Sequence, residues 1–298
     1  MAVGVLFPGQ GSQMVGMDRA SDGSPLDPAT FEEVDEALGE RLSRIVAEGP
    51  EDALARTENT QPALLAAGVA AWRWVQRRVP DLAVAAAAGH SLGEYAALVA
   101  SGAMALGDAA RLVRLRGRAM QAAVPHGVGA MAAVVGLDDD ALDALCAEVA
   151  AGEVVEVAAW NCPGQITVAG HASAVARLVA AVETAGGIAR PLAVSAPFHC
   201  SLLAPAADPL RAALAEVRIS PGAFPVVHNV DAAVATDAEG IRARLVAQVV
   251  APVRWSACVR TLRSLGVDDA WECGPGRTLA GLVRRIDRNM VVRAGREA

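Results

Sequence analysis

The stretch VAAAAGHSLGEYAALVA, residues 84–100, decides the fold of this chain. Residues 83–88 are small and apolar without interruption, as in a strand that is buried on both faces, and residues 94–100 are good helix formers. Between them, residues 89–93 read Gly-His-Ser-Leu-Gly. A strand that turns sharply into a helix around Gly-x-Ser-x-Gly is a nucleophile elbow. We therefore predict an α/β fold whose large part has a parallel sheet and resembles the α/β-hydrolases.

Ser91 is the candidate nucleophile of this elbow. Its main chain would adopt a strained turn, and the flanking glycines would avoid clashes there. The hydroxyl would be exposed at the positive end of a helix, where the main-chain N–H of Leu92 can donate to a developing oxyanion. The alternative is a serine that only caps the helix, and the predicted strand and helix around the motif disfavour it.

The loop after the first predicted strand offers a second oxyanion donor. Residues 3–7 read as this strand, and residues 8–13, Pro-Gly-Gln-Gly-Ser-Gln, follow it at the position where α/β folds bind ligands. A phosphate-binding loop is excluded because the motif Gly-Lys-Ser/Thr is absent. We expect the side-chain amide of Gln10, or a main-chain N–H of this loop, to complete an oxyanion hole with Leu92. The alternative is an ordinary tight turn.

Composition narrows the classes of function. Of the 298 residues, 53% are hydrophobic and 20% are charged, which suits a large core and is unlike a disordered chain. The net charge of -7 argues against a nucleic-acid-binding protein. All 26 basic residues are arginine, which excludes Schiff-base chemistry and a lysine general base.

Targeting and redox signals predict a cytoplasmic protein. Residues 1–10 lack a charged leader, and no apolar stretch is long enough to span a membrane. The five cysteines are scattered without Cys-x-x-Cys spacing, so we expect reduced thiols and no metal site.

Two predicted helices flank the elbow. The first spans residues 61–79 and carries Pro62 in its first turn. The second spans residues 109–121, and Arg116 lies in it beside Gly117, which would let a ligand approach the helix. Because a guanidinium binds carboxylates in a bidentate manner, Arg116 is one candidate for holding a substrate carboxylate. The other arginines of this helix are expected to face solvent: Arg111, Arg114 and Arg118.

The region from residue 127 to residue 195 changes character. Its apolar patterns predict strands and helices in the order β-α-β-β-α-β, the ferredoxin-like pattern. The predicted strands are 129–135, 154–160, 165–169 and 188–194, and the predicted helices are 138–150 and 171–185. We therefore predict a small ferredoxin-like subdomain at 127–195, inserted in a large subdomain of residues 1–126 and 196–298, with the cleft between them.

A serine nucleophile needs a base, and His199 is the best-placed histidine because it follows the last strand of the insert. His90 adjoins the serine, so its side chain points elsewhere, and His228 reads as a histidine in the core or at a strand end. No Asp or Glu stands out as the third member of a triad. A dyad whose imidazole N–H is held by a main-chain carbonyl stays possible.

With these residues in view, the chain resembles the malonyl-CoA:acyl carrier protein transacylases, the acyltransferase family of fatty acid and polyketide synthesis. The resemblance covers nearly the whole length, and several motifs in the same order make it specific. The motifs are FPGQGSQ, TENTQPAL, GHSLGEYAAL, LRGRAMQ, GVGAMAAVVGL, WNCPGQITVAG, APFHC, APVRW and ECGPG.

The resemblance implies a role for each site residue. Ser91 matches the nucleophile that receives the malonyl group, and His199 matches its base. Gln10 and the N–H of Leu92 match the oxyanion hole, and Arg116 matches the clamp on the free carboxylate. Gln248 matches the residue whose main-chain carbonyl holds the histidine, and Asn161 matches a pocket-lining asparagine. Phe198 departs from the serine that discrete bacterial enzymes often have and matches malonyl-selective polyketide domains. The pathway, fatty acid or polyketide, therefore stays open.

The implied reaction is ping-pong transfer of malonyl from malonyl-CoA, through a malonyl-serine, to the phosphopantetheine thiol of acyl carrier protein. No bound cofactor, membrane or nucleic-acid partner is implied, and we expect a monomer. The alternatives are a trans-acting polyketide synthase acyltransferase, an editing acyl hydrolase, a serine hydrolase and a carrier-binding scaffold. A serine hydrolase should have an acidic triad member, and editing hydrolases often lack the arginine, so the sequence favours transfer.

Overall fold

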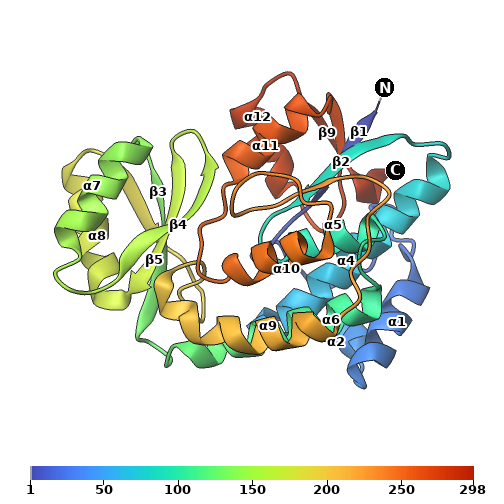
Figure 1. Ribbon diagram of the computed structural model, residues 1–298, viewed down its shortest axis with the longest axis horizontal. Coiled ribbons are helices and arrows are strands. Elements are labelled where there is room, and N and C mark those ends of the chain that lie inside the picture. Colours follow the sequence, from blue (N-terminus) through green and yellow to red (C-terminus); the bar gives the residue numbers. More distant parts are fainter. Residues whose placement is uncertain (1) are drawn as a thin grey trace.

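The computed structural model describes residues 2–298 and contains a larger and a smaller β-sheet (Figure 1). The larger sheet has five strands in the order β7-β2-β1-β8-β9, and every neighbouring pair is parallel. Its strands are β1 (Val3–Phe7), β2 (Val84–Gly89), β7 (Val226–Val227), β8 (Asp269–Glu272) and β9 (Val291–Ala294). The predicted α/β fold with a parallel sheet is thus confirmed.

Helices cover both faces of this sheet because its central strands are apolar on both sides. Val5, Phe7 and Ala87 belong to the core on one face, whereas Leu6 and Ala86 belong to the core on the other. This arrangement explains the uninterrupted small apolar run of β2. The first core includes residues of α4 (Thr57–Arg78), α5 (Gly93–Ala100) and α6 (Leu106–Ala123), and the second includes residues of α11 (Trp255–Ser264) and α12 (Thr278–Ile286).

Further helices surround this framework. They are α1 (Pro28–Leu38), α2 (Leu42–Glu48), α3 (Glu51–Ala55), α9 (Ala207–Glu216), α10 (Ala238–Ala247) and the 3₁₀ helices η1 (Ser201–Ala206) and η2 (Gly295–Glu297). Residues of α1, α2, α9 and α10 extend the first core.

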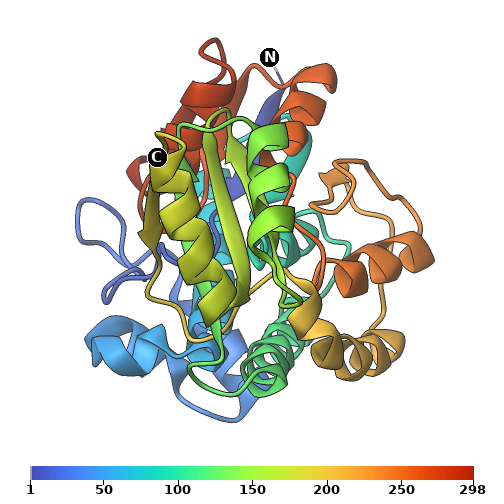
Figure 2. The same ribbon diagram turned by 90° about the vertical axis from the view of Figure 1, so that its left-hand side faces the viewer.

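The smaller sheet has four antiparallel strands in the order β4-β5-β3-β6. They are β3 (Gly129–Val135), β4 (Val155–Cys162), β5 (Gln165–His171) and β6 (Ile188–Pro191). Two helices, α7 (Asp139–Val149) and α8 (Ala172–Thr184), cover its outer face, which Figure 2 turns toward the viewer. The predicted ferredoxin-like order is therefore confirmed, and all six elements lie within the predicted range 127–195. The division at 127 and 195 stays a prediction.

The small sheet is tied to the rest of the chain by main-chain hydrogen bonds. The N–H of Trp160 in β4 donates to the carbonyl of Val253 at 2.9 Å, and the N–H of Val253 donates to the carbonyl of Ala158 at 2.9 Å. Val253 precedes α11, so the small sheet is anchored to the helix layer of the large one.

Both helices that flank the elbow begin earlier than predicted, and α6 begins at Leu106, three residues before residue 109. Helix α4 begins at Thr57, four residues before the predicted start at residue 61, and Pro62 lies in its second turn. Thr57, Thr60 and Gln61 are buried, and Thr60 Oγ1 donates to the carbonyl of Leu54 at 2.6 Å. Tertiary burial of these polar residues stabilises an extra turn that the proline signal did not predict.

All five cysteines are free and buried. Burial is the largest cause of a raised pKa at every one of these thiols, to about 11 at Cys146 and about 12 at Cys200. The five cysteines are therefore core residues.

Candidate active site

The turn between β2 and α5 has the geometry of a nucleophile elbow. Ser91 has a φ of 53°, in the left-handed region that residues other than glycine rarely adopt. A Cβ atom at Gly89 would lie 1.9 Å from the carbonyl carbon of Gly93, and one at Gly93 would lie 2.2 Å from the carbonyl oxygen of Phe7. Both positions therefore require glycine, because the turn packs directly against its own backbone and against β1.

Ser91 and His199 form a hydrogen-bonded pair. Ser91 Oγ donates to His199 Nε2 at 2.6 Å, and His199 Nδ1 donates to the main-chain carbonyl of Gln248 at 2.9 Å. Because a carbonyl only accepts, this bond fixes the tautomer that leaves Nε2 free to take a proton. Burial, and then the positive charge of Arg116, lower the pKa of His199 to about 3. The imidazole is therefore neutral at neutral pH.

Arg116 reaches this pair from α6. Its Nη2 donates to Ser91 Oγ at 3.0 Å and to Gln248 Oε1 at 2.9 Å, and its Nη1 donates to Gln61 Oε1 at 2.8 Å. The residue is only 2% exposed. Over residues 2–298, its hydrogen-bond partners are amide and hydroxyl oxygens and include no carboxylate. Arg116 is thus a buried cation beside the nucleophile with no anion of the chain paired to it.

Gln10 and Leu92 lie at the mouth of the same cleft. Within the described chain, neither main-chain N–H donates a hydrogen bond. The Gln10 side chain is engaged elsewhere, since its Nε2 lies 3.3 Å from Thr57 Oγ1 as the donor of a hydrogen bond. Two unpartnered main-chain donors at the ends of adjacent parallel strands suit an oxyanion.

A cleft of about 420 Å³ contains these groups. Ser91, His199, Arg116 and Phe198 line it, together with Met131 from the small sheet. The cleft thus lies between the two sheets, where it was predicted.

Two predicted site residues lie behind the lining. Gln248 is fully buried and contacts Ser91 and His199 from the side away from the cleft. Asn161, on β4, accepts from His90 Nε2 at 3.0 Å and donates to Thr167 Oγ1 at 2.9 Å. Asn161 therefore acts on the cleft through His90 and Thr167, both of which line it.

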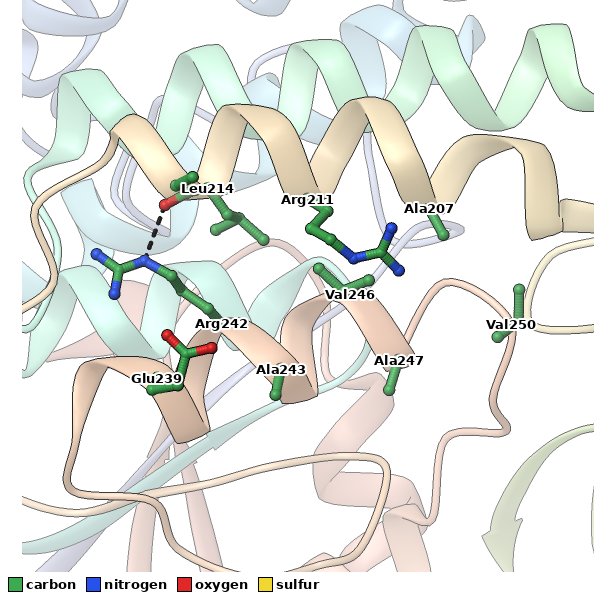
Figure 3. A pocket seen from close by; sticks show the side chains of 10 residues that line it. Ala207, Arg211, Leu214, Glu239, Arg242, Ala243, Val246, Ala247 and Val250 are labelled. Atoms are coloured by element: carbon green, nitrogen blue, oxygen red, sulfur yellow. Dashed lines mark hydrogen bonds between the residues drawn. The ribbon is translucent and has the colours of Figure 1, made fainter.

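A larger hollow of about 620 Å³ lies between α9 and α10 and contains none of the predicted site residues (Figure 3). Arg242 there donates to the carbonyls of Leu214 and Val217, at the end of α9. These bonds give the carbonyls at the C-terminal end of α9 a side-chain partner. The hollow is a feature of helix packing.

Two expectations about α6 are wrong. Arg114 is buried, because it donates to Asn59 Oδ1 and forms an ion pair with Glu40 at 2.9 Å. A Cβ atom at Gly117 would lie 2.8 Å from the carbonyl oxygen of Thr57. Gly117 therefore allows close packing of α6 against α4 and does not face the ligand cleft. Arg111 and Arg118 are exposed, as predicted.

Three residues around the site had no role predicted from the sequence: Gln61, Glu94 and Asn229. Asn229 follows β7, which is the neighbour of β2 in the sheet. Polar residues after adjacent parallel strands converge, but β7 has only two residues and leaves almost no periodic signal, so the sequence did not indicate Asn229. Gln61 and Glu94 lie within helices, and the sequence gives no sign that their faces meet Arg116 and Asn229.

The described structure contains neither a metal-binding cluster nor a membrane-spanning helix. Among residues 2–298, no group of three or more His, Cys, Asp or Glu side chains could hold a metal ion. In the same part of the chain, no helix has the length and apolar character needed to cross a membrane.

Comparison with known proteins gives consistent matches. The model of a family described as acyl transferase domain matches residues 5–269. The malonyl CoA-acyl carrier protein transacylase of Salmonella typhimurium is 47% identical over 286 residues, which cover 94% of this chain and 91% of that protein. The protein of the same description from Bacillus subtilis is 41% identical, and the match covers 97% of this chain and 91% of that protein.

Solved structures are similar over the whole chain. The malonyl CoA-acyl carrier protein transacylase of Coxiella burnetii gives a TM-score of 0.96 at 40% identity and covers 100% of this chain and 94% of that one. A second structure holds a type II PKS acyl-carrier protein in complex with its malonyl-transacylase. It gives a TM-score of 0.96 at 44% identity, and the match covers 100% of this chain and 97% of that one.

Proposed function

This chain belongs to the malonyl-CoA:acyl carrier protein transacylase family, and from that premise we propose that it carries a malonyl group from malonyl-CoA to the phosphopantetheine thiol of an acyl carrier protein. The transfer runs in two halves through a malonyl ester of Ser91. The observation that carries this proposal is the buried Arg116, whose Nη2 lies 3.0 Å from Ser91 Oγ.

An acyl group with its own carboxylate would complete the site. The Arg116 guanidinium is charged, buried and without a carboxylate partner in the described chain. An unpaired buried charge is costly, so an anionic ligand that pairs with it binds favourably. Malonyl carries such an anion at the end opposite to its thioester, whereas acetyl has none. The position of Arg116 therefore favours malonyl as the acyl group.

In the first half-reaction, His199 Nε2 takes the proton of Ser91 Oγ as the oxygen attacks the thioester carbonyl. The main-chain carbonyl of Gln248 holds the imidazolium that forms, in place of an acidic residue. When the tetrahedral intermediate collapses, the carbon–sulfur bond breaks and His199 returns the proton to the leaving sulfur. Coenzyme A leaves as the thiol, and Ser91 holds the malonyl group.

The oxyanion of this intermediate would accept from the free main-chain N–H groups of Gln10 and Leu92. Each such donor contributes roughly 10²–10³-fold in rate. In the second half-reaction, His199 takes the proton of the phosphopantetheine thiol, and the sulfur attacks the malonyl ester through the same oxyanion hole. Ser91 regains its proton from His199 when the ester bond breaks.

One copy of the chain supplies every residue of this proposal. We therefore propose a monomer that works without a bound cofactor and treats malonyl-CoA as a substrate. The carrier protein is the partner of the second half-reaction, as the complex of the similar malonyl-transacylase with its acyl-carrier protein suggests.

A trans-acting role in polyketide synthesis is a second candidate, and Phe198 is the observation that favours it. Its ring lines the cleft beside His199, where many discrete bacterial enzymes have serine. An editing hydrolase is disfavoured, because Arg116 would fix the malonyl group and exclude uncharged acyl groups.

The test is intact-mass spectrometry after brief incubation with malonyl-CoA and acetyl-CoA in competition, followed by addition of a phosphopantetheine-bearing carrier protein. We expect one malonyl group on the enzyme that moves to the carrier. The variant Ser91→Ala should take up none, because it lacks the hydroxyl that forms the ester. Ser264→Ala, an exposed serine of α11, is the matched control and should behave as the unmodified chain does.

Persistence of the malonyl adduct in Ser91→Ala would rule out Ser91 as the nucleophile. An adduct that decays to free malonate with none on the carrier would favour an editing hydrolase instead.

A further inference from the structure

A layer of buried polar residues lies behind the elbow, on the side away from the cleft. Glu94 from α5, His228 and Asn229 after β7, and Gln248 after α10 are each 0% exposed. Buried polar groups are costly unless their hydrogen bonds are satisfied. Here the side chains of Asn229 and Gln248 bond to the main chain of the elbow. The Glu94 carboxylate in turn bonds to Asn229, Gln248 and His228.

The Asn229 side chain bridges the elbow. Its Oδ1 accepts from the main-chain N–H of Ser91 at 2.7 Å, and its Nδ2 donates to the main-chain carbonyl of Gly89 at 2.8 Å. One amide thus holds both sides of the turn that places Ser91 at a φ of 53°. Such a conformation persists only where the surroundings determine it.

Glu94 holds Asn229 in turn. Its Oε2 accepts from the main-chain N–H of Asn229 at 2.9 Å and from Gln248 Nε2 at 2.8 Å, while its Oε1 accepts from His228 Nδ1 at 2.7 Å. Asn229 is therefore fixed at its main chain by Glu94, while its side chain is bonded to the elbow. This arrangement pre-organises the turn before any substrate binds.

We infer that Asn229 is a positioning residue for the acyl transfer, which holds the main chain of Ser91 so that its Oγ lies within reach of His199. The inference rests on the proposed role of Ser91 as the nucleophile. Without the Asn229 amide, the Ser91 N–H and the Gly89 carbonyl lose their partner, and the turn can relax toward a more common conformation. A shift of about 1 Å in a reacting atom costs about 100-fold in rate.

The experiment compares Asn229→Ala with the unmodified chain in two measurements. The first is the rate at which a small uncharged fluorophosphonate labels Ser91, followed by intact mass, because this reagent needs no contact with Arg116. The second is kcat and KM for malonyl transfer. We expect labelling and kcat to fall together by about 100-fold. KM for malonyl-CoA should stay within about twofold, because the Arg116 contacts are kept.

Asn59→Ala is the matched control. Asn59 is also a buried asparagine with two side-chain bonds: its Nδ2 donates to the carbonyl of Ala53 at 2.8 Å, and its Oδ1 accepts from Arg114. It contacts neither Ser91 nor His199. Its loss should lower the melting temperature and leave the labelling rate per folded molecule unchanged.

Labelling of folded Asn229→Ala at the rate of the unmodified chain would overturn the inference. Failure of the unmodified chain to label at Ser91 would instead overturn the proposed function.

A measurement without substitution covers the case in which the variant does not fold. The amide proton of Ser91 should exchange slowly with solvent by NMR, because Asn229 Oδ1 accepts it. Exchange as fast as that of the exposed Gly127 would also refute the inference.

Discussion

Arg116 combines a full positive charge with near-complete burial, and this combination is the strongest chemical signal of the site. Burial lowers its pKa, which marks the cost of keeping the guanidinium away from water. The side-chain oxygen of Gln61 accepts from its Nη1, and that of Gln248 accepts from its Nη2. The two amides orient the guanidinium but carry no charge. The positive charge of Arg116 is therefore available to pair with the carboxylate of the proposed substrate.

Arg116→Ala should therefore lose malonyl transfer and gain relative use of acetyl-CoA. We expect kcat/KM for malonyl-CoA to fall by about 30-fold to about 4,000-fold, the usual effect of removing one partner of a buried charged pair. Arg118→Ala is the control, since that side chain is 59% exposed and pairs with Glu58 on the surface. A competition assay with the two thioesters measures the preference. Unchanged malonyl selectivity in Arg116→Ala would contradict the clamp.

The low pKa of His199 leads to a prediction about pH. The base must be neutral to take a proton. In the free enzyme, burial and the charge of Arg116 lower the pKa of His199 to about 3. Activity is thus lost only as pH falls through that value. We expect kcat/KM for acylation of Ser91 to be level between about pH 5 and about pH 8. A half-loss near 6.5, the ordinary pKa of histidine, would show that the imidazole is not shielded as the structure indicates.

At the scale of elements, the contact between α4 and α6 sets the site. Helix α4 carries Gln61 and α6 carries Arg116, and the two residues, 55 positions apart in the chain, meet at 2.8 Å. The approach is possible because Gly117 has no side chain to separate the helices. The position of Arg116 therefore depends on Gly117, a residue that does not line the cleft.

Gly117→Ala should destabilise the fold and weaken malonyl binding together. Its Cβ would lie 2.8 Å from the carbonyl oxygen of Thr57, and overpacking of this kind costs about 1–3 kcal/mol. Gly281→Ala in α12 is the control, since no atom lies within 4 Å of the added Cβ. It should gain about 0.5–1 kcal/mol from helix propensity. Thermal melts and KM for malonyl-CoA measure both effects, and a stability gain in Gly117→Ala would refute the argument.

The same elements show what sequence patterns can and cannot predict. The elbow, the first strand and the β-α-β-β-α-β order follow from local periodicity and glycine placement, and the structure confirms them. The start of α4 was missed because burial of Thr57 and Thr60 in the folded chain decides it, and Thr57 Oγ1 bonds to Ser195 Oγ, 138 positions away. Arg114 was expected in solvent for the same reason, because its partners Glu40 and Asn59 lie on other elements.

At the scale of the whole molecule, the site is assembled from segments that are far apart in the chain. Ser91 meets His199 across 108 positions and Asn229 across 138. The position of His199 after the last strand of the insert predicted the first pair, and the family resemblance implied the same pair. The second pair depends on β7 lying beside β2, and a strand of two residues leaves almost no periodic signal. The buried layer behind the elbow therefore became visible only in the fold.

The burial of all five cysteines has a consequence for a chain that handles thioesters. A thioester passes its acyl group to any accessible thiolate, and a raised pKa keeps a thiol protonated and unreactive. With their thiols enclosed and protonated, the cysteines of the enzyme do not compete for the malonyl group. In the proposed mechanism, a malonyl group on Ser91 would therefore leave only to the thiol of a substrate or to water. The same property means that thiol-directed dyes added to a reaction mixture would label released coenzyme A and the carrier's free phosphopantetheine thiol, and would leave the folded enzyme unlabelled.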